Sequence, residues 1–163
     1  DTATVAAMLE ELRGDVQATL TELRELAHGI YPPLLMDRGL GEALRAAANR
    51  SILAAEVRAE VGRFSSDVEA AVYFCCLEAL QNAGKHAGAG ARVTITVHAG
   101  DGRLCFEVAD DGAGFDPSTV RRSHGFVNME DRLGAIGGSL TIDASPGHGA
   151  RVRGEIPLQA SQS

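Results

Sequence analysis

The sequence contains no tryptophan, and aromatic residues make up only 4% of its 163 positions. Hydrophobic residues still reach 45%, which is enough for a real core, so that core must be aliphatic. A basic excess is also missing, because the formal net charge is -7. Since a nucleic-acid-binding module would present a basic face, this balance indicates an ordinary acidic protein without a direct nucleic-acid partner.

The chain is also poor in cysteine and in long apolar runs. Cys75, Cys76 and Cys105 have no metal-ligand spacing and lie in apolar stretches, so we expect small buried hydrophobic residues in a reducing compartment. No run approaches the length of a membrane span, and no signal-peptide pattern is present. We therefore expect a cytoplasmic segment that makes no membrane contact. Because it begins inside an amphipathic helical pattern, we expect a fragment of a longer parent protein, which is free to carry a membrane anchor elsewhere.

Glycine, by contrast, is abundant. The chain has 19 glycines, and they concentrate after position 84. This density suggests a backbone that is shaped to approach a ligand closely. Neither the P-loop pattern GxxxxGK[ST] nor the Rossmann pattern GxGxxG occurs, so any nucleotide site here is of another kind.

Residues 2–30 form one long helical pattern. Its apolar positions are alternately four and three residues apart, interrupted only by Thr19, and this spacing makes a heptad seam. The seam consists of Val5, Leu9, Leu12, Val16, Leu23, Leu26 and Ile30. A seam this narrow favours a dimerising helical hairpin over a helix packed on its own domain. Tyr31-Pro32-Pro33 should end the helix, because Pro cannot continue it.

The following residues alternate between helix and strand patterns. Residues 34–41 read as a connector, and a helix follows to about residue 51. Residues 56–61 alternate between apolar and charged side chains, as in a short, half-exposed strand. The run Ser66-Asp67-Val68-Glu69 resembles a capping box, and it should open a helix that continues to about His86.

Strand patterns predominate in the last part of the chain. Alternating apolar residues predict hairpins at 93–108, with Gly100-Asp101-Gly102 as the turn, and at 140–156. Between them we expect a polar, mobile loop at 116–124 and a helix at about 126–136. This order predicts an α/β fold, namely a two-layer α/β sandwich whose mixed, largely antiparallel sheet is covered by helices on one face, preceded by the long N-terminal helix.

The most unusual stretch is 77–86, which reads as the end of a helix. Glu78 and Asn82 are four residues apart, and Lys85 and His86 follow at a spacing that returns them to the same face. A carboxylate, a carboxamide, an ammonium and an imidazole thus form one stripe on an otherwise apolar helix. This combination suggests a phosphate group and a metal ion.

Two glycine features follow this stretch. Asp110-x-Gly112-x-Gly114 closes a strand, where a carboxylate can accept a hydrogen bond from an exocyclic amine such as that of adenine. Glycines beside it would let a base lie flat against the backbone, although a tight turn has the same pattern. Gly125 begins a helix, whose free N–H groups and dipole favour phosphate, although an ordinary hinge also uses glycine.

In their order and spacing, these three motifs resemble the ATP-binding domain of histidine kinases over about residues 37–158. The wider superfamily includes DNA gyrase-type ATPases and anti-sigma-factor serine kinases. The runs NAGKHA at 82–87 and GFVNMEDR at 125–132 look most like two-component sensor kinases of the nitrate-sensor-like subfamily. Residues 23–32 resemble the end of that subfamily's dimerisation hairpin.

The resemblance implies roles for the residues that match the motifs. Asn82 corresponds to a Mg²⁺ ligand, whose oxygen suits a hard ion held mainly by phosphates and water. Glu78 corresponds to a catalytic acidic residue that orients or polarises a nucleophile or water near the metal. Lys85 and His86 would face the phosphates, and Asp110 would accept the adenine amine.

The remaining matched positions would shape and close the same nucleotide site. Gly112 and Gly114 would form the wall of the adenine pocket. The segment 116–124 would be a short ATP lid, with Gly125 at the phosphates after it. His124 borders this lid, where it can touch phosphate.

The resemblance implies an ATP-binding catalytic domain at 34–159, after a partial dimerisation helix and linker at 1–33 and before a tail at 160–163. The intact kinase would be a homodimer with ATP and Mg²⁺ as cofactors, and it would move the γ-phosphoryl group to a histidine for relay to a cognate, DNA-binding response regulator. The usual acceptor run, Glu-Leu-His-Asp, is absent, and His28 does not match it. We therefore expect a linker role for His28 and no autophosphorylation by this chain alone.

A second departure lies in the final hairpin. Ala150 stands where the family usually has a Thr near the adenine pocket, which would remove one polar contact worth about 1 kcal/mol.

Two other functions stay open. An ATPase or anti-sigma-type serine kinase would use Glu78 as a general base, but the heptad helix and the Pro-Pro break count against it. A non-catalytic nucleotide-binding dimerisation module has only Ala150 and the plain lid in its favour.

Overall fold

The structure is a computed structural model that describes residues 1–27, 32–120 and 124–158, without the side chains of 20–27, 119, 120 and 124. The expectations for His28, for the end of the first helix at 28–31 and for the tail at 160–163 therefore fall outside the described residues. The chain divides into two compact units, Asp1–Pro33 and Leu34–Ser163, and each is described by itself.

The first unit contains one long helix, α1 (Thr2–Ala27), where the heptad pattern predicts it. The first apolar residues of the seam are exposed: Val5, Leu9, Leu12 and Val16 keep 50% to 61% of their surface accessible. Thr19 interrupts the seam, and its hydroxyl donates to the carbonyl of Asp15 at 2.9 Å. An apolar stripe of this kind is typical of a helix that pairs with another helix.

A short helix lies within the connector that the sequence predicts at 34–41, and the helix predicted after the connector is present. Helix α2 spans Pro33–Arg38, and helix α3 spans Leu40–Asn49. Pro33 is the first residue of α2, a position where its missing N–H costs nothing and its fixed φ suits the helix. Arg63 donates to the carbonyl oxygen of Met36 at 2.8 Å, so one of the unpaired carbonyls at the end of α2 is satisfied. The connector prediction missed this helix because it treated the prolines only as a stop.

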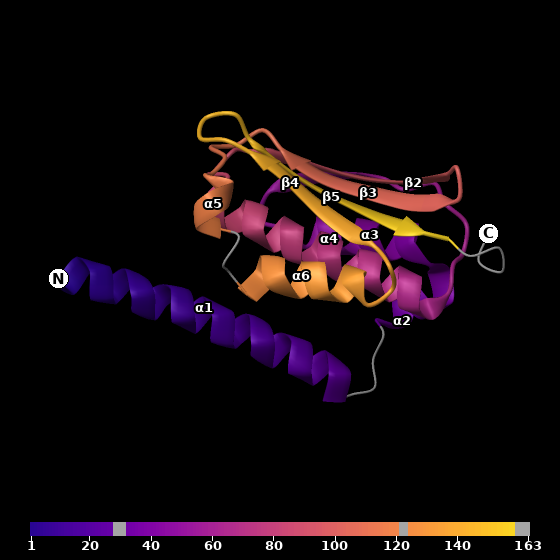
Figure 1. Ribbon diagram of the computed structural model, residues 1–163, viewed down its shortest axis with the longest axis horizontal. Helices are drawn as coiled ribbons and strands as arrows, with labels where there is room; N and C mark the ends of the chain where they lie inside the picture. The colour runs from indigo at the N-terminus through magenta and orange to yellow at the C-terminus, as the bar shows by residue number, and fades with distance from the viewer. Residues whose placement is uncertain (28–31, 121–123, 159–163) are drawn as a thin grey trace. The chain divides into compact units, whose positions relative to one another are not determined.

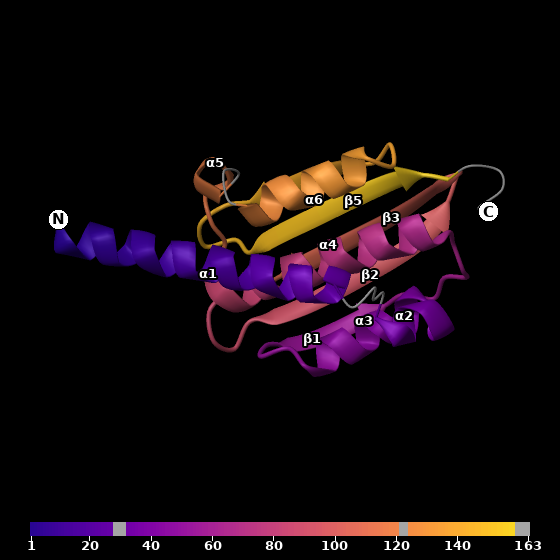
Figure 2. The same ribbon diagram turned by 90° about the horizontal axis from the view of Figure 1, so that it is seen from below.

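Helix α4 (Ser66–His86) lies between α3 and α6 in the helical layer (Figure 2). Its N-cap is Ser65, whose hydroxyl accepts from the N–H of Val68 at 3.4 Å, so the predicted capping box is displaced by one residue. Glu69 is only 3% exposed, pairs with Arg63 at 2.9 Å and accepts from the N–H of Phe64, just before the helix, at 3.4 Å. The helix ends with His86, as the sequence predicts.

The sheet has five strands in the order β1-β2-β3-β5-β4. The strands are β1 (Ala54–Arg58), β2 (Arg92–Gly100), β3 (Arg103–Asp110), β4 (Ser139–Ala144) and β5 (Ala150–Pro157). β1 and β2 are parallel, and the other neighbours are antiparallel. The turn between β2 and β3 has positive φ at Asp101 and Gly102, which fits a tight hairpin.

The helices α3, α4 and α6 cover one face of this sheet, as Figure 1 shows for the second unit. The described core between the two layers is aliphatic apart from Tyr73, Phe106 and Phe126, with Ile95 and Leu104 also fully buried. The opposite face carries charged pairs across the strands, including Arg153 with Glu107 at 2.6 Å. This arrangement confirms the predicted two-layer α/β sandwich with a mixed, largely antiparallel sheet.

The segment between β3 and β4 differs from its prediction. A short helix, α5 (Pro117–Val120), lies where the sequence predicts only loop, and Asp116 holds its start by accepting from the N–H of Ser118 at 3.0 Å. Helix α6 spans His124–Gly134, so it begins and ends about two residues earlier than predicted. Residues 121–123 lie outside the described part of the chain.

Candidate functional site

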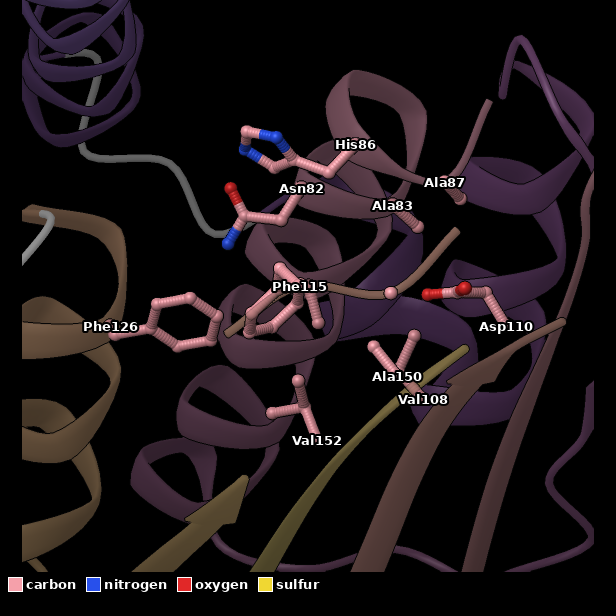
Figure 3. Close-up of a pocket in the computed structure, with 12 residues that line it drawn as sticks. Asn82, Ala83, His86, Ala87, Val108, Asp110, Phe115, Phe126, Ala150 and Val152 are labelled. Atoms are coloured by element: carbon pink, nitrogen blue, oxygen red, sulfur yellow. The ribbon is translucent and has the colours of Figure 1, made fainter. Parts of the chain in front are cut away.

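A pocket lies where α4, the ends of β3 and β5, and the start of α6 come together (Figure 3). Its lining residues are Ala79, Asn82, Ala83, His86, Ala87, Val108, Asp110, Gly114, Phe115, Phe126, Ala150 and Val152. Most of these side chains are apolar, and a few polar groups converge among them, as in many small-molecule sites. The polar groups come from two segments that the sequence singles out, the helix end at 77–86 and the loop at 110–114.

Asp110 is the carboxylate at one end of the pocket. It is the last residue of β3 and faces Ala150 of β5 in the register of the sheet. Its Oδ1 atom accepts from the N–H of Gly112 at 2.9 Å, and the backbone of Ala150 also supports the charged form. Burial nevertheless outweighs these bonds and raises the pKa of Asp110 above its ordinary value. The fold therefore holds a partly desolvated carboxylate in place, ready to accept a hydrogen bond from a ligand.

The loop after Asp110 is fixed on both sides by close backbone contacts. A Cβ atom on Gly112 would overlap the carbonyl oxygen of Ala87 at the end of α4, and one on Gly114 would overlap the carbonyl oxygen of Ser145. Gly114 also has φ +68, which glycine adopts without strain. Between them, the N–H of Ala113 donates to Ala87 at 2.9 Å. Both glycines are therefore required by the packing of the loop, and Gly114 reaches the pocket wall.

Asn82 points into the pocket from α4 (Figure 3), and its Nδ2 atom is buried without a hydrogen-bond partner in the described structure. An unpaired buried amide is costly, so this group marks a place where a ligand completes the bonding. The two ends of a side-chain amide are assigned from their bonding partners, and rotation presents Oδ1 at the same place. The carboxamide thus fits a Mg²⁺ ion that takes its other ligands from phosphate and water.

Of the remaining polar residues of the predicted stripe, one lines the pocket and two lie outside its lining. His86 lines the pocket beside Asn82, whereas Lys85 and Glu78 do not line it. Lys85 is exposed in the last turn of α4. The carboxylate of Glu78 lies against the first turn of α6, because a Cβ atom on Gly125 would overlap its Oε1 atom. Glu78 therefore connects the helix that carries Asn82 to the start of α6.

Gly125 is the second residue of α6, beside the pocket that Phe126 lines. Its lack of a side chain gives the carboxylate of Glu78 room to approach the helix start. The side chain of His124 lies outside the described part of the structure. Gly125 thus lies at a helix N-terminus, where N–H groups are free to bind an anion.

Sequence reasoning missed the aromatic residues of the pocket. Phe115 lies with its ring centroid 6.0 Å from that of Phe126 and 6.5 Å from that of His86. The only sequence signal for Phe115 was its place directly after Gly114. Ala150, expected near the adenine pocket, is among the lining residues and contributes only a methyl group.

Contacts outside the pocket hold α4 and α6 together. Cys75 is buried, its thiol lies 3.9 Å from the carbonyl oxygen of Met129, and burial raises its pKa to about 12. The guanidinium of Arg132 lies over the ring of Phe74 at 4.7 Å from its centroid. Cys75 is thus a protonated packing group, as predicted, whereas Cys105 is only half-buried and departs from the prediction.

Within the described residues, no group of three or more His, Cys, Asp or Glu side chains is arranged to hold a metal ion. The described helices also include none with the length and apolar character needed to cross a membrane. Any metal in the pocket would therefore depend on Asn82 together with oxygens of a bound ligand.

Comparison with known proteins supplies independent information on this pocket. The model of a family described as "Histidine kinase-, DNA gyrase B-, and HSP90-like ATPase" matches residues 67–160. That range includes α4, the loop after β3 and the start of α6, so it contains each segment that lines the pocket.

Curated relatives align over a larger part of the chain. An uncharacterised sensor-like histidine kinase of Chloroflexus aurantiacus is 30% identical over 98% of this chain and 29% of its own length. The signal transduction histidine-protein kinase/phosphatase UhpB of Salmonella typhimurium is 31% identical over 83% of this chain and 28% of its own length. The chain thus spans under a third of the length of these two relatives.

Solved structures share the fold. The histidine kinase domain of a blue-light activated histidine kinase from Erythrobacter litoralis superposes with a TM-score of 0.64, at 23% identity. The match covers 73% of this chain and 61% of that one. At this identity the likeness establishes the arrangement of helices and strands.

Proposed function

This chain belongs to the family of histidine kinase-, DNA gyrase B- and HSP90-like ATPases, and we propose that it is the ATP-binding catalytic domain of a sensor histidine kinase. One observation carries the proposal: a single pocket holds a fixed carboxylate, Asp110, and an unpaired buried carboxamide, Asn82 (Figure 3). Apolar side chains that a nucleotide base requires, such as Ala83, Val108 and Val152, line the same pocket. The relatives that bear the name histidine kinase support the assignment.

Asp110 recognises the adenine base. Its carboxylate accepts from Gly112 through one oxygen, which fixes the side chain at the end of β3. The exocyclic amine of adenine is the donor that a carboxylate in this position selects, whereas a guanine presents a carbonyl there. The walls formed by Ala83, Val108 and Val152 would hold the faces of the base.

Asn82 forms the metal and phosphate end of the site. Its amide oxygen would bind Mg²⁺ together with the phosphates and water, and the ion supplies charge neutralisation during phosphoryl transfer. His86 lines the pocket on the same side and would donate to a phosphate oxygen. Lys85 would add positive charge from the last turn of α4.

Glu78 and the start of α6 complete this end. Gly125 places the N-terminus of α6 next to the carboxylate of Glu78, so the two form one surface beside the phosphates. In this arrangement Glu78 orients the nucleophile, and the preceding lid at 116–124, with His124, closes on the nucleotide. Transfer of this type depends mainly on positioning and on electrostatic stabilisation.

The phosphoryl acceptor is a histidine of the intact kinase that this chain does not supply. The exposed seam of α1 supports a homodimer of that kinase, because an apolar stripe at Val5, Leu9 and Leu12 needs a partner helix. The phosphoryl group then passes to a response regulator. The chain alone therefore binds ATP without phosphorylating itself.

Calorimetric titration with a non-hydrolysable ATP analogue, with and without Mg²⁺, tests the proposal. We expect saturable binding that Mg²⁺ strengthens. Failure to bind at millimolar nucleotide would contradict the assignment. Incubation with radiolabelled ATP is the second arm, and an acid-labile phosphohistidine on this chain alone would overturn the statement that the acceptor lies elsewhere.

A further inference from the structure

Phe115 occupies the middle of the pocket. Figure 3 shows its ring between Phe126 and Asp110, below the carboxamide of Asn82. The cavity that remains has a volume of about 10 Å³. That is the space of about one water molecule, which is less than a nucleotide base requires. A nucleotide base therefore cannot enter while the ring keeps this position.

The backbone directly before Phe115 is anchored by hydrogen bonds and close packing. Up to Gly114 the loop is anchored to the turn that follows β4, since the N–H of Gly147 donates to the carbonyl of Ala113 at 2.6 Å and Gly114 packs against Ser145. Among the residues that the structure describes, the backbone of Phe115 itself makes no hydrogen bond of this kind. The fixed part of the loop thus ends immediately before the residue that fills the pocket.

Two aromatic contacts, with His86 and Phe126, hold the ring in the pocket. Phe115 is half-buried. Its ring lies at an interplanar angle of 62° to the ring of His86 and 46° to the ring of Phe126, so neither pair is stacked face to face. Contacts of this kind can be exchanged for contacts with a ligand. The fully buried Phe126, by contrast, belongs to the core.

We propose that Phe115 is a gate on the nucleotide pocket, whose ring leaves the pocket when an adenine nucleotide enters. The movement is a change of the backbone dihedral angles directly after Gly114. Asp110, Gly112 and Gly114 therefore keep their positions while the ring of Phe115 moves. This inference rests on the proposed function, because the displacing ligand is the nucleotide. It adds a conformational step to binding, and only molecules with the ring outside bind productively.

The association kinetics of a nucleotide with the full chain test the gate. A fluorescent ATP analogue with Mg²⁺ is mixed in a stopped-flow instrument with wild type, Phe115→Ala and Phe64→Ala. Phe64 is the matched control, since it is also a half-buried phenylalanine but does not line the pocket. We expect the association rate constant of Phe115→Ala to rise by about tenfold, because the closed form no longer competes with the nucleotide, and that of Phe64→Ala to equal wild type.

The outcomes separate the gate from the proposed function. Binding with an equal or lower association rate constant in Phe115→Ala overturns the gate and leaves the nucleotide site intact. A rise of equal size in Phe64→Ala also overturns it, since general loosening would then explain the effect. Absence of nucleotide binding in all three proteins overturns the proposed function, and the gate with it.

A second variant keeps the proposal testable if Phe115→Ala unfolds. The chain has no tryptophan, so Phe115→Trp carries a single one, and its emission, excited selectively over that of the two tyrosines, reports on this position. We expect saturating nucleotide to increase the quenching of this tryptophan by acrylamide, because the ring moves from the pocket to solvent. Unchanged or reduced quenching under saturation means that the ring stays inside, which contradicts the gate.

Discussion

The two ends of the pocket are built in different ways. At the base end, Asp110 and the loop to Gly114 are held by backbone groups of β3, α4 and the β4–β5 turn. At the proposed phosphate end, the groups that would contact the ligand belong to α4 and to the start of α6. The Nδ2 atom of Asn82 is buried there without a hydrogen-bond partner in the described structure. The groups proposed to bind the base are thus held before any ligand binds, apart from the Phe115 ring that fills the pocket, whereas the proposed phosphate end is completed by its ligand. Each of the following predictions tests this difference.

The largest effect is expected for Gly114→Ala, compared with Gly147→Ala. Both glycines have positive φ, at +68 and +80, so each substitution costs about 1–2 kcal/mol of backbone strain. Only at Gly114 would the new methyl group also overlap a carbonyl oxygen, that of Ser145, which adds about 1–3 kcal/mol. Urea unfolding followed by circular dichroism should therefore show a clearly greater loss of stability for Gly114→Ala. Equal losses would mean that the base end is not fixed by this contact.

Replacing the carboxylate is expected to change base selection. Asp110→Asn keeps the shape of the side chain but loses the charged acceptor, so the affinity for ATP should fall about 30-fold while the weak affinity for GTP stays the same. The control is Asp111→Asn, because Asp111 is exposed and its Oδ1 atom accepts from the N–H of Arg92 at 2.7 Å. Calorimetric titration measures both affinities. Parallel losses for ATP and GTP would show that Asp110 does not read the base.

The corresponding change at the phosphate end should depend on the metal. Asn82→Ala removes the proposed Mg²⁺ ligand and also the unpaired buried amide. We expect the factor by which Mg²⁺ strengthens nucleotide binding to fall about tenfold, to near unity. Thermal unfolding without ligand should show little or no loss of stability, because the amide has no partner to lose. A destabilised variant would indicate that Asn82 is a structural residue instead.

The smallest effect is a dependence of stability on pH. Burial raises the pKa of Asp110 in the folded protein above its ordinary value of 3.8. Between that value and the raised value the folded protein binds more protons than the unfolded chain, so the free energy of unfolding contributed by this group falls as pH rises. Asp110→Asn removes this contribution. The stability of Asp110→Asn relative to wild type should increase through this pH window and then stay constant, as thermal unfolding at a series of pH values would show. A relative stability that is independent of pH would contradict the raised pKa.

Much of the fold follows from local patterns in the sequence. The alternation in β2 and β3 places Val93, Ile95 and Leu104 in the core, because side chains of a strand alternate between two faces. The failures are at element boundaries and in short helices. α2 was missed because the two prolines were read only as a stop, although proline also suits a first helical turn. The cap of α4 is Ser65, one residue earlier than predicted, and Glu69 is paired with Arg63, a contact that residue spacing does not reveal.

The sequence predicts the polar residues of the candidate site better than the apolar and aromatic residues that line the pocket. Asn82, His86 and Asp110 belong to motifs with fixed spacing, and all three line the pocket. Lys85 was predicted on the same stripe, but its position in the last turn turns it away from the lining. Phe115 could not be assigned from the sequence, because its ring fills the pocket only through tertiary contacts with Phe126 and His86.

The effect of Mg²⁺ on the affinity for a non-hydrolysable ATP analogue tests the separation of the two ends most directly. It is measured by calorimetry as the ratio of the dissociation constants without and with Mg²⁺, in wild type, Asp110→Asn and Asn82→Ala. We predict the same ratio in wild type and Asp110→Asn, although the latter binds more weakly under both conditions, and a ratio near unity in Asn82→Ala. A ratio that collapses in Asp110→Asn, or one that survives in Asn82→Ala, would contradict the account.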